Sequence, residues 1–252
     1  MPGQSRSGRS RAGRRHGREL GQHFLESAAL ASRLAADAGI EPSDHVVEFG
    51  AGTGTLTTAL LDRGARVSAI EVDPVLAAGL ARRFAQTNAV AVYACDLSEF
   101  PLPTTPYRVL ANPPFNHTAA ILHRLLDDPA GGLVRADLVV QWQVARALAR
   151  GGHDDAVDLA GASWAPWWHF RRARRLPAQL FRPAPSVDAA VLTVTRRAPN
   201  VLPVDAAPAF RHFVRERFDR SRLDTADDWV QRFRRHTSPP DSVSAARGRR
   251  TQ

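Results

Sequence analysis

The chain has 252 residues, 44% of them hydrophobic and 23% charged, which is the composition of an ordinary globular protein whose core is large enough to fold by itself. Its formal net charge is +9, and because it contains no lysine, this positive charge comes from arginine, which favours a polyanionic partner such as nucleic acid. No apolar run is long enough to span a bilayer and the single cysteine, Cys95, excludes an intramolecular disulfide, so we expect a cytoplasmic protein without a membrane segment or secretory signal.

Residues 1–18 consist mainly of glycine, serine and arginine and contain no acidic side chain. Such a segment has no hydrophobic periodicity and cannot bury enough apolar surface to fold, so we predict that it is disordered. We interpret it as an arm that contacts RNA and becomes ordered on binding, and a tail that only improves solubility is the alternative. The arginines of this arm that we expect to contact RNA are Arg11, Arg14, Arg15 and Arg18.

The stretch over residues 45–54, HVVEFGAGTG, organises the predicted fold. A short apolar run containing Glu48 is followed by alternating glycines at Gly50, Gly52 and Gly54. After a helix over 26–38, this spacing predicts a strand, a tight loop and a helix over 55–61 that points its N-terminus at a bound group, the first crossover of a doubly wound α/β domain. A dinucleotide fingerprint would need a glycine where Thr55 stands, and a turn without a ligand is the alternative interpretation.

Two acids at predicted strand ends are candidate cofactor ligands. A second strand over 67–70 ends at Glu71, where a carboxylate can accept hydrogen bonds from both ribose hydroxyls of an adenosine cofactor. A solvated strand end is the alternative for Glu71. After a helix over 74–86, a third strand over 90–95 leads to Asp96 and Leu97. Asp96 can accept a hydrogen bond from an adenine amino group while a neighbouring side chain packs on the ring.

A fourth strand over 107–111 ends in Asn112-Pro113-Pro114-Phe115. An exocyclic amino group is a poor nucleophile because its lone pair is delocalised into the ring. The side-chain oxygen of Asn112 and the carbonyl of Pro113 can accept its two N–H bonds and favour a pyramidal nitrogen, while Phe115 stacks on the extruded base. A tight turn with a core phenylalanine is the alternative.

The remainder of the sheet is less distinctive. We expect a helix over 116–126, a fifth strand over 137–144 and an alternating strand over 187–194. From Trp164 the chain becomes aromatic and basic, and this stretch either binds RNA or forms a strand with one buried and one solvated face, two interpretations that we weigh equally. Its candidate RNA-binding residues are Arg171, Arg172 and Arg174.

A change of composition near 198–208 predicts a linker, beyond which apolar residues recur at helical spacing among many arginines. We therefore expect one domain over residues 19–197 and a small basic helical RNA-binding domain over 198–252. The nine histidines show no metal-ligand spacing, so we predict no metal site.

Six motifs in this order and spacing resemble those of the rRNA adenine N6-methyltransferases, most of all the Erm branch, which modifies 23S rRNA and confers macrolide, lincosamide and streptogramin B resistance. They are GQHFL at 21–25, EFGAGTG at 48–54, Glu71, CDL at 95–97, NPPF at 112–115 and FRPAPSVDAAVL at 181–192. The resemblance covers about residues 18–197 and implies a seven-stranded methyltransferase sheet with a small C-terminal helical domain. The family usually has asparagine where His23 stands and a branched residue where Pro113 stands.

By this resemblance the domain over 19–197 is the catalytic one, and Asn112, Pro113 and Phe115 form its target-adenine pocket. The residues implied to bind the cofactor, S-adenosylmethionine, are Gln22, His23, Leu25, Gly50, Gly52, Glu71, Asp96, Leu97 and Asn112. The implied reaction is methyl transfer to N6 of an adenine in 23S rRNA, by a protein that we expect to be a monomer. The alternatives are a 16S rRNA adenine dimethylase and a nucleic-acid-binding protein that has a degenerate methyltransferase fold.

Overall fold

The structure is a computed structural model in which residues 23–149, 158–219 and 224–237 are described. The predicted arm over residues 1–18 and the predicted cofactor ligand Gln22 lie outside these ranges. The arm's candidate RNA contacts lie outside them too, namely Arg11, Arg14, Arg15 and Arg18.

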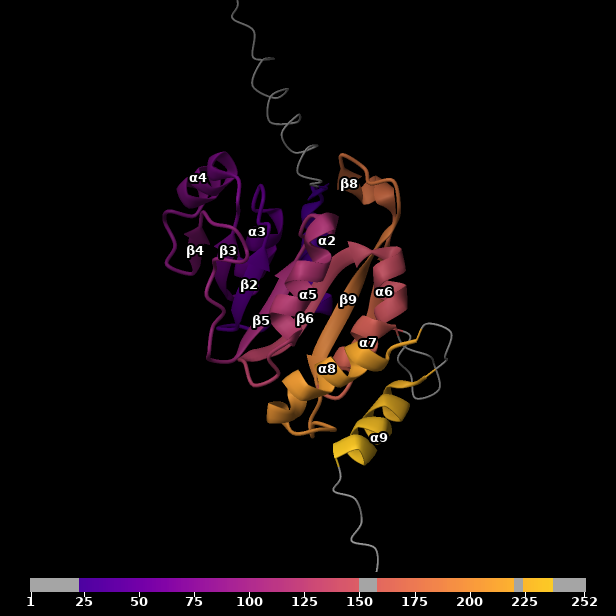
Figure 1. Ribbon diagram of the computed structural model, residues 1–252. Coiled ribbons are helices and arrows are strands. Elements are labelled where there is room, and N and C mark those ends of the chain that lie inside the picture. Colours follow the sequence, from indigo (N-terminus) through magenta and orange to yellow (C-terminus); the bar gives the residue numbers. More distant parts are fainter. Residues whose placement is uncertain (1–22, 150–157, 220–223, 238–252) are drawn as a thin grey trace, which may run out of the picture.

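Seven strands form one twisted sheet at the centre of the molecule (Figure 1). They are β2 (His45–Phe49), β3 (Arg66–Ile70), β4 (Val90–Tyr93), β5 (Tyr107–Ala111), β6 (Leu133–Gln141), β7 (Trp168–Leu176) and β9 (Ala189–Arg196). Their order is β4-β3-β2-β5-β6-β9-β7; β9 runs antiparallel to both β6 and β7, and the other neighbouring pairs are parallel. The chain order reverses between β2 and β5, so the predicted doubly wound, seven-stranded sheet is confirmed.

Helices cover both faces of this sheet because successive side chains along a strand point to opposite sides. Val46 of β2 joins one hydrophobic cluster and Val47 joins the other. The first cluster lies under α2 (Ala28–Asp37), α3 (Thr55–Leu61) and α4 (Pro74–Arg83). The second lies under α5 (Thr118–Leu126), α6 (Trp142–Leu148) and α7 (Leu159–Trp164). Short 3-10 turns are η1 (Phe115–His117), η2 (Ala178–Leu180) and η3 (Val204–Ala206).

The predicted bounds of the fifth strand are wrong. This strand is β6, which spans Leu133–Gln141, whereas the expected range was 137–144. Its end is set by Trp142, whose N–H donates to the carbonyl of Asp188 at 2.9 Å as the chain turns into α6. The apolar run continues from the strand into the helix without a break, so hydrophobicity could not mark this boundary.

The aromatic and basic stretch after Trp164 forms the edge strand β7, as one of the two interpretations predicted. Trp164, Trp167 and Trp168 are at most 2% exposed, so these rings belong to the core and are not available for stacking on RNA bases. Their indole N–H groups donate to Asp127, to the carbonyl of Leu202 and to the carbonyl of Leu126, respectively. Only the arginines of this stretch remain as candidate RNA contacts.

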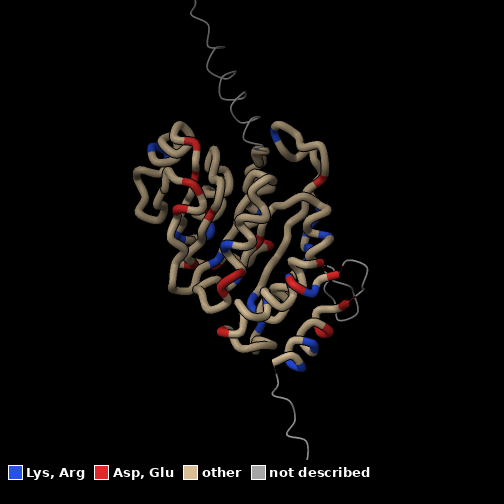
Figure 2. The backbone as a smooth tube through the Cα atoms, viewed as in Figure 1, with Lys and Arg blue, Asp and Glu red and all other residues tan. Residues whose placement is uncertain are grey.

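Two helices follow the sheet in sequence, α8 (Ala207–Arg217) and α9 (Ala226–Thr237). Their apolar faces extend the second cluster, since the Phe210 ring lies 5.7 Å from the Trp167 ring and 5.2 Å from the Phe233 ring. Acidic residues occupy the first turn of α9 and basic residues its last turn, as the red and blue segments in Figure 2 show, which complements the helix dipole. Among the described residues, no helix is both long enough and apolar enough to cross a membrane.

Candidate functional site

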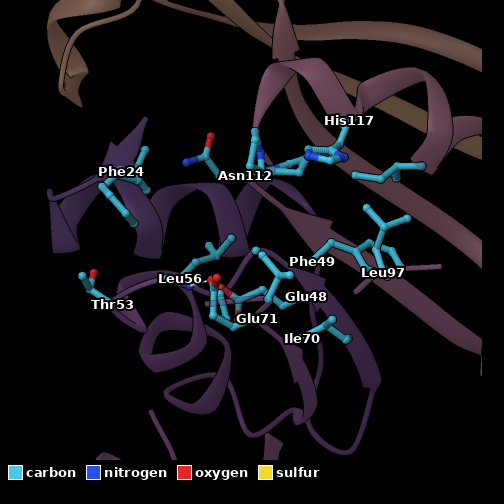
Figure 3. A pocket seen from close by; sticks show the side chains of 18 of the residues that line it. Phe24, Glu48, Phe49, Thr53, Leu56, Ile70, Glu71, Leu97, Asn112 and His117 are labelled. Carbon is cyan, nitrogen blue, oxygen red and sulfur yellow. Dashed lines mark hydrogen bonds between the residues drawn. The ribbon is translucent and has the colours of Figure 1, made fainter. Parts of the chain in front are cut away.

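A crevice opens at the carboxyl ends of β2, β3 and β5, where the strand order reverses (Figure 3). Open α/β sheets bind ligands at this place because the loops that leave neighbouring strands diverge there. The empty space, including the part open to solvent, is about 790 Å³. The predicted site residues that line it are His23, Leu25, Gly50, Gly52, Glu71, Asp96, Leu97, Asn112 and Pro113.

The glycine loop forms one side of the crevice. Gly50, Gly52 and Gly54 have φ angles of +71°, +56° and +80°, a left-handed conformation that residues with a Cβ rarely adopt. The N–H of Gly50 donates to the carbonyl of Ile70 at 2.9 Å, which turns the chain directly after β2. A Cβ on Gly54 would lie 2.7 Å from the Leu80 side chain, so the loop packs against α4 with no room for a larger residue.

Glu71 is a structural part of this loop as well as a residue of the crevice wall. Its Oε2 accepts a hydrogen bond from the N–H of Gly52 at 2.8 Å and its Oε1 accepts one from the N–H of Asp73 at 3.0 Å. The alternative of a solvated strand end is wrong, because Glu71 is 1% exposed. Burial raises the pKa of Glu71, and the two backbone hydrogen bonds oppose that shift. Each oxygen keeps the capacity to accept a second hydrogen bond from a ligand hydroxyl.

Glu48 lies beside Glu71 in the wall, and sequence reasoning assigned it no role. Its Oε2 accepts a hydrogen bond from the Thr57 hydroxyl at 2.7 Å. Burial raises the pKa of Glu48 to about 8, the Thr57 hydrogen bond opposes this, and the charge of Glu71 adds to it. Glu48 is therefore mainly protonated at neutral pH. Only its position just before the glycines could have marked it in the sequence.

Asp96 supplies a carboxylate at the end of the third predicted strand. Its Oδ1 accepts hydrogen bonds from the N–H and the hydroxyl of Ser98, at 2.8 and 2.6 Å, and these lower the pKa of Asp96. Its other oxygen makes no hydrogen bond to a described residue and is available to a ligand amine. Burial raises the pKa of the neighbouring Cys95 thiol, helped by the charge of Glu99, which disfavours the thiolate.

Asn112 faces these acids from the opposite side of the crevice (Figure 3). Its Nδ2 donates a hydrogen bond to the main-chain carbonyl of His23 at 2.8 Å. Its Oδ1 is buried and has no hydrogen-bond partner among the described residues. A buried acceptor without a partner is costly, so the site is complete only when a ligand donor reaches this oxygen.

The segment that carries His23 is held in place by residues from the far end of the domain. Strand β1 (Phe24–Leu25) pairs with β8 (Phe181–Arg182) in a separate two-stranded sheet. The Nδ1 of His23 donates to the carbonyl of Pro183 at 2.8 Å, because a carbonyl can only accept. The imidazole is thus committed to a protein contact through Nδ1, and its Nε2 is the nitrogen left for a ligand.

Phe115 is the predicted pocket residue that the structure does not bring into the crevice wall. It lies on η1, half-buried, with its ring 5.3 Å from the imidazole of His23. The preceding turn does line the crevice through Asn112 and Pro113, and so does His117, which the sequence did not single out. His117 comes only two residues after the NPPF motif, and that proximity was the one available signal.

The candidate RNA-binding arginines lie on β7, at the far edge of the sheet from the glycine loop. Arg174 binds Asp37 of α2 through two hydrogen bonds of 2.8 and 2.6 Å, so it is engaged on the face that α2 covers. Arg171 pairs in register with Thr193, whereas Arg172 pairs with Leu192 of the opposite face. The three arginines therefore do not form one patch.

A comparison with models of protein families identifies the family of the chain. The family model described as "Ribosomal RNA adenine dimethylase" matches residues 13–226. The chain belongs to the ribosomal RNA adenine dimethylase family. It is an S-adenosylmethionine-dependent rRNA adenine N6-methyltransferase.

The relatives include both a drug-resistance protein and small-subunit rRNA methyltransferases. The chain is 36% identical to the rRNA adenine N-6-methyltransferase of Corynebacterium diphtheriae, over 79% of this chain and 76% of that protein. It is 35% identical to the mycinamicin-resistance protein MyrB of Micromonospora griseorubida, over 81% and 63%. It is also 35% identical to the ribosomal RNA small subunit methyltransferase A of Mycolicibacterium vanbaalenii, over 80% and 67%.

Solved structures share the fold of this chain. The crystal structure of the 23S rRNA methyltransferase ErmE superposes with a TM-score of 0.66 at 29% identity, covering 76% of this chain and 77% of that one. A dimethyladenosine transferase from Plasmodium falciparum has a TM-score of 0.67 at 22% identity, which supports the fold.

The residues present in the crevice fit the family's cofactor. They suit an adenosine that carries a methyl-bearing side chain. The glycines of the loop leave their backbone accessible, and Glu71 and Asp96 can accept further hydrogen bonds. The buried amide oxygen of Asn112 has no partner among the described residues. The side chains of Phe49, Leu56 and Ile70 supply apolar wall between them.

Proposed function

We propose that this protein transfers a methyl group from S-adenosylmethionine to N6 of an adenine in 23S rRNA, and that this confers resistance to macrolide, lincosamide and streptogramin B antibiotics. The observation that carries this proposal is the side chain of Asn112: its buried Oδ1 has no partner in the part of the chain that the structure describes, while its Nδ2 is held by the His23 carbonyl. The 23S assignment is supported by the likeness to ErmE and to a mycinamicin-resistance protein.

Asn112 would act on the nucleophile. The hydrogen bond to the His23 carbonyl holds the amide in place in the crevice wall. The amide oxygen would accept one N–H bond of the target amine, and the carbonyl of Pro113 would accept the other, which favours a pyramidal nitrogen with a localised lone pair. An oriented acceptor of this kind stabilises the charge that develops on the amine as it attacks.

The hydrogen-bond acceptors of the crevice wall indicate how the cofactor would bind. Glu71 would accept the ribose hydroxyls, and Asp96 would accept the adenine amino group beside Leu97. Gly50 and Gly52 would let the cofactor lie against bare backbone, and His23 and Leu25 would close the site from β1. When bound, S-adenosylmethionine supplies an electrophilic methyl group on a sulfonium centre.

The target base has to leave its stack to reach Asn112, since N6 is inaccessible inside a helix. In our proposal Phe115 stacks on the extruded adenine after a small movement from its place beside His23. Proton loss follows the attack on the sulfonium, so the chain needs no strong general base. Alignment of the two reactants then supplies a large part of the acceleration, about 7 kcal/mol or more.

We also propose how the rest of the chain serves this reaction. The domain over 19–197 is catalytic, and the arm over 1–18 and the basic segment over 198–252 bind rRNA. A further part of the RNA surface comes from the edge strand, through Arg171, Arg172 and Arg174. The protein acts as a monomer in the cytoplasm on rRNA that is not yet assembled into ribosomes.

Turnover by Asn112→Ala tests this assignment. The variant should lose about 100-fold or more in turnover, because it lacks the acceptor that acts in the transition state, while its affinity for S-adenosylmethionine largely survives. The matched control is Asn88→Ala in the exposed turn before β4, which should turn over as the parent does. Equal turnover by Asn112→Ala and the parent would end the assignment.

A 16S rRNA adenine dimethylase is the second candidate, because the identity to a small subunit methyltransferase A is 35%, the same as to the mycinamicin-resistance protein. Primer extension on 23S and 16S rRNA after expression of the chain separates the two. A stop in 23S rRNA alone supports our proposal, and a stop in 16S rRNA alone supports the second candidate.

A further inference from the structure

A cluster of one indole and two guanidinium groups lies outside the crevice and has no part in the proposed methyl transfer. It consists of Trp142, Arg172 and Arg175, and we call it the Trp142 ledge. The guanidinium carbon of Arg172 lies 4.4 Å from the centroid of the Trp142 ring, and that of Arg175 lies 5.0 Å from it. Both are within cation-π distance, so the half-buried indole restrains two arginines of the edge strand.

The two arginines of the ledge differ in their other partners. Arg175 forms an ion pair with Asp188 at 2.7 Å, and the carbonyl of Asp188 accepts the N–H of Trp142, so these three residues brace one another. Arg172 is exposed and forms no ion pair with any residue in the described ranges. Its guanidinium is thus oriented by the indole while its N–H donors remain available to an anion.

The ledge lies on the same face of the sheet as the target-adenine turn, near the carboxyl ends of β5 and β6. Strands β5 and β6 are parallel neighbours with Ala111 opposite Leu138, so Trp142 begins three residues beyond the level of Asn112. Trp142 is thus about 10 Å along the strands and about 5 Å across them from Asn112. Arg172 is level with Ala111 through Leu192 and Leu138, three strands away and about 14 Å across the sheet. Asn112 leads into α5 and Trp142 begins α6, two helices that cover the same face (Figure 1).

We propose that the Trp142 ledge binds a phosphate of the rRNA strand that carries the target adenine, with Arg172 as the phosphate ligand. An enzyme that extrudes a base has to hold the backbone beside it, and a planar guanidinium matches phosphate with two parallel hydrogen bonds. Because the indole already restrains Arg172, less conformational freedom is lost on binding. This inference rests on the rRNA substrate of the proposed function.

The ledge also refines which arginines of the edge strand serve RNA. Arg174 is held by Asp37 on the opposite face of the sheet, so we do not expect it to contact the same phosphate. Trp142 and Arg175 come from separate parts of the sequence, and only the pairing of β7 with β9 and of β9 with β6 brings them together.

The test measures RNA affinity without cofactor, so that it is independent of methyl transfer. Protein-free 23S and 16S rRNA transcripts are titrated with the parent, Arg172→Gln and Arg66→Gln, at several salt concentrations. Arg66 is the matched control, since it is also exposed but begins β3, one strand in from the opposite edge of the sheet. Thermal unfolding and the dissociation constant for S-adenosylmethionine are measured for each variant, and both should equal those of the parent.

We expect Arg172→Gln to bind the transcripts about tenfold more weakly, the loss typical of one charge-assisted hydrogen-bonded contact. The slope of log affinity against log salt should fall by about 0.7, because one phosphate contact in a single strand releases that fraction of a counterion. Trp142→Leu keeps the charge and the apolar packing, so it should weaken binding several-fold with an unchanged salt slope.

Equal affinities and slopes for Arg172→Gln and Arg66→Gln would overturn the proposal, as would an unchanged affinity of Trp142→Leu. This failure differs from failure of the proposed function. If the parent methylates neither rRNA, the function is wrong, whereas the binding difference between the two arginine variants would still be measured and would decide the ledge.

Discussion

Replacement of Glu48 by glutamine should stabilise the cofactor-free protein and remove much of its pH dependence. Glu48 is 1% exposed, and its pKa in the folded protein is about 8 compared with an ordinary value of 4.5. Between these two values the unfolded chain holds Glu48 ionised while the folded protein must keep it protonated. The free energy of unfolding therefore falls as pH rises through this window and levels off above it.

The size of the effect follows from the shift. One pKa unit corresponds to about 1.4 kcal/mol, so the whole window corresponds to about 5 kcal/mol and the part below pH 7 to about 3 kcal/mol. Glutamine is neutral at every pH and can still accept the hydrogen bond from the Thr57 hydroxyl. Glu48→Gln should accordingly exceed the parent by up to about 3 kcal/mol at neutral pH and match it near pH 4.5.

Urea unfolding followed by circular dichroism, at a series of pH values between about 4.5 and 8, measures this difference. Other groups that titrate in this range are the same in Glu48→Gln and the parent, so the difference between their unfolding free energies reports the titration of Glu48. Glu41→Gln, an exposed position, is the control and should follow the parent throughout. Parallel curves for Glu48→Gln and the parent would refute the reasoning, because they would mean that Glu48 is ionised in the folded protein.

Three further variants test other parts of the structure. Gly54→Ala should destabilise the protein by about 2 kcal/mol or more, because its φ of +80° is strained for alanine and the new methyl group would meet Leu80 at 2.7 Å. Trp167→Phe should cost about 1–3 kcal/mol more in chemical denaturation than Trp229→Phe. The indole N–H of Trp167 donates to the carbonyls of Leu202 and Pro203, whereas that of Trp229 has no partner among the described residues.

A measurement can contradict each of these predictions. A Gly54→Ala protein as stable as the parent would mean that the loop relaxes away from α4. If Trp229→Phe proved as damaging as Trp167→Phe, the unpaired indole of Trp229 would not be the deciding difference between them.

The sequence was most informative where a local pattern determines the backbone. The alternating glycines and the strand before them predicted the crossover at β2, and the order of strands with acids at their ends predicted that Glu71 and Asp96 meet in one crevice. Parallel strands bring their carboxyl ends to one edge, so placement of these residues required only correct strand assignment.

The parts that the sequence did not predict depend on contacts between distant segments. The orientation of Asn112 is set by His23, which in turn is held by Pro183, 160 residues away, and no local pattern encodes that chain of hydrogen bonds. The protonation of Glu48 depends on how completely the fold buries it. Trp164 to Trp168 looked equally suited to RNA and to a core, and only the packing of α5 and α8 against these rings decided for the core.

The most direct test of the central claim is to map the product. The protein is incubated with labelled S-adenosylmethionine and protein-free 23S or 16S rRNA, and the labelled nucleotide is located and identified. Our account predicts label on N6 of adenine in 23S rRNA and none with Asn112→Ala. Label in 16S rRNA alone, on another atom, or undiminished in the Asn112→Ala reaction would contradict it.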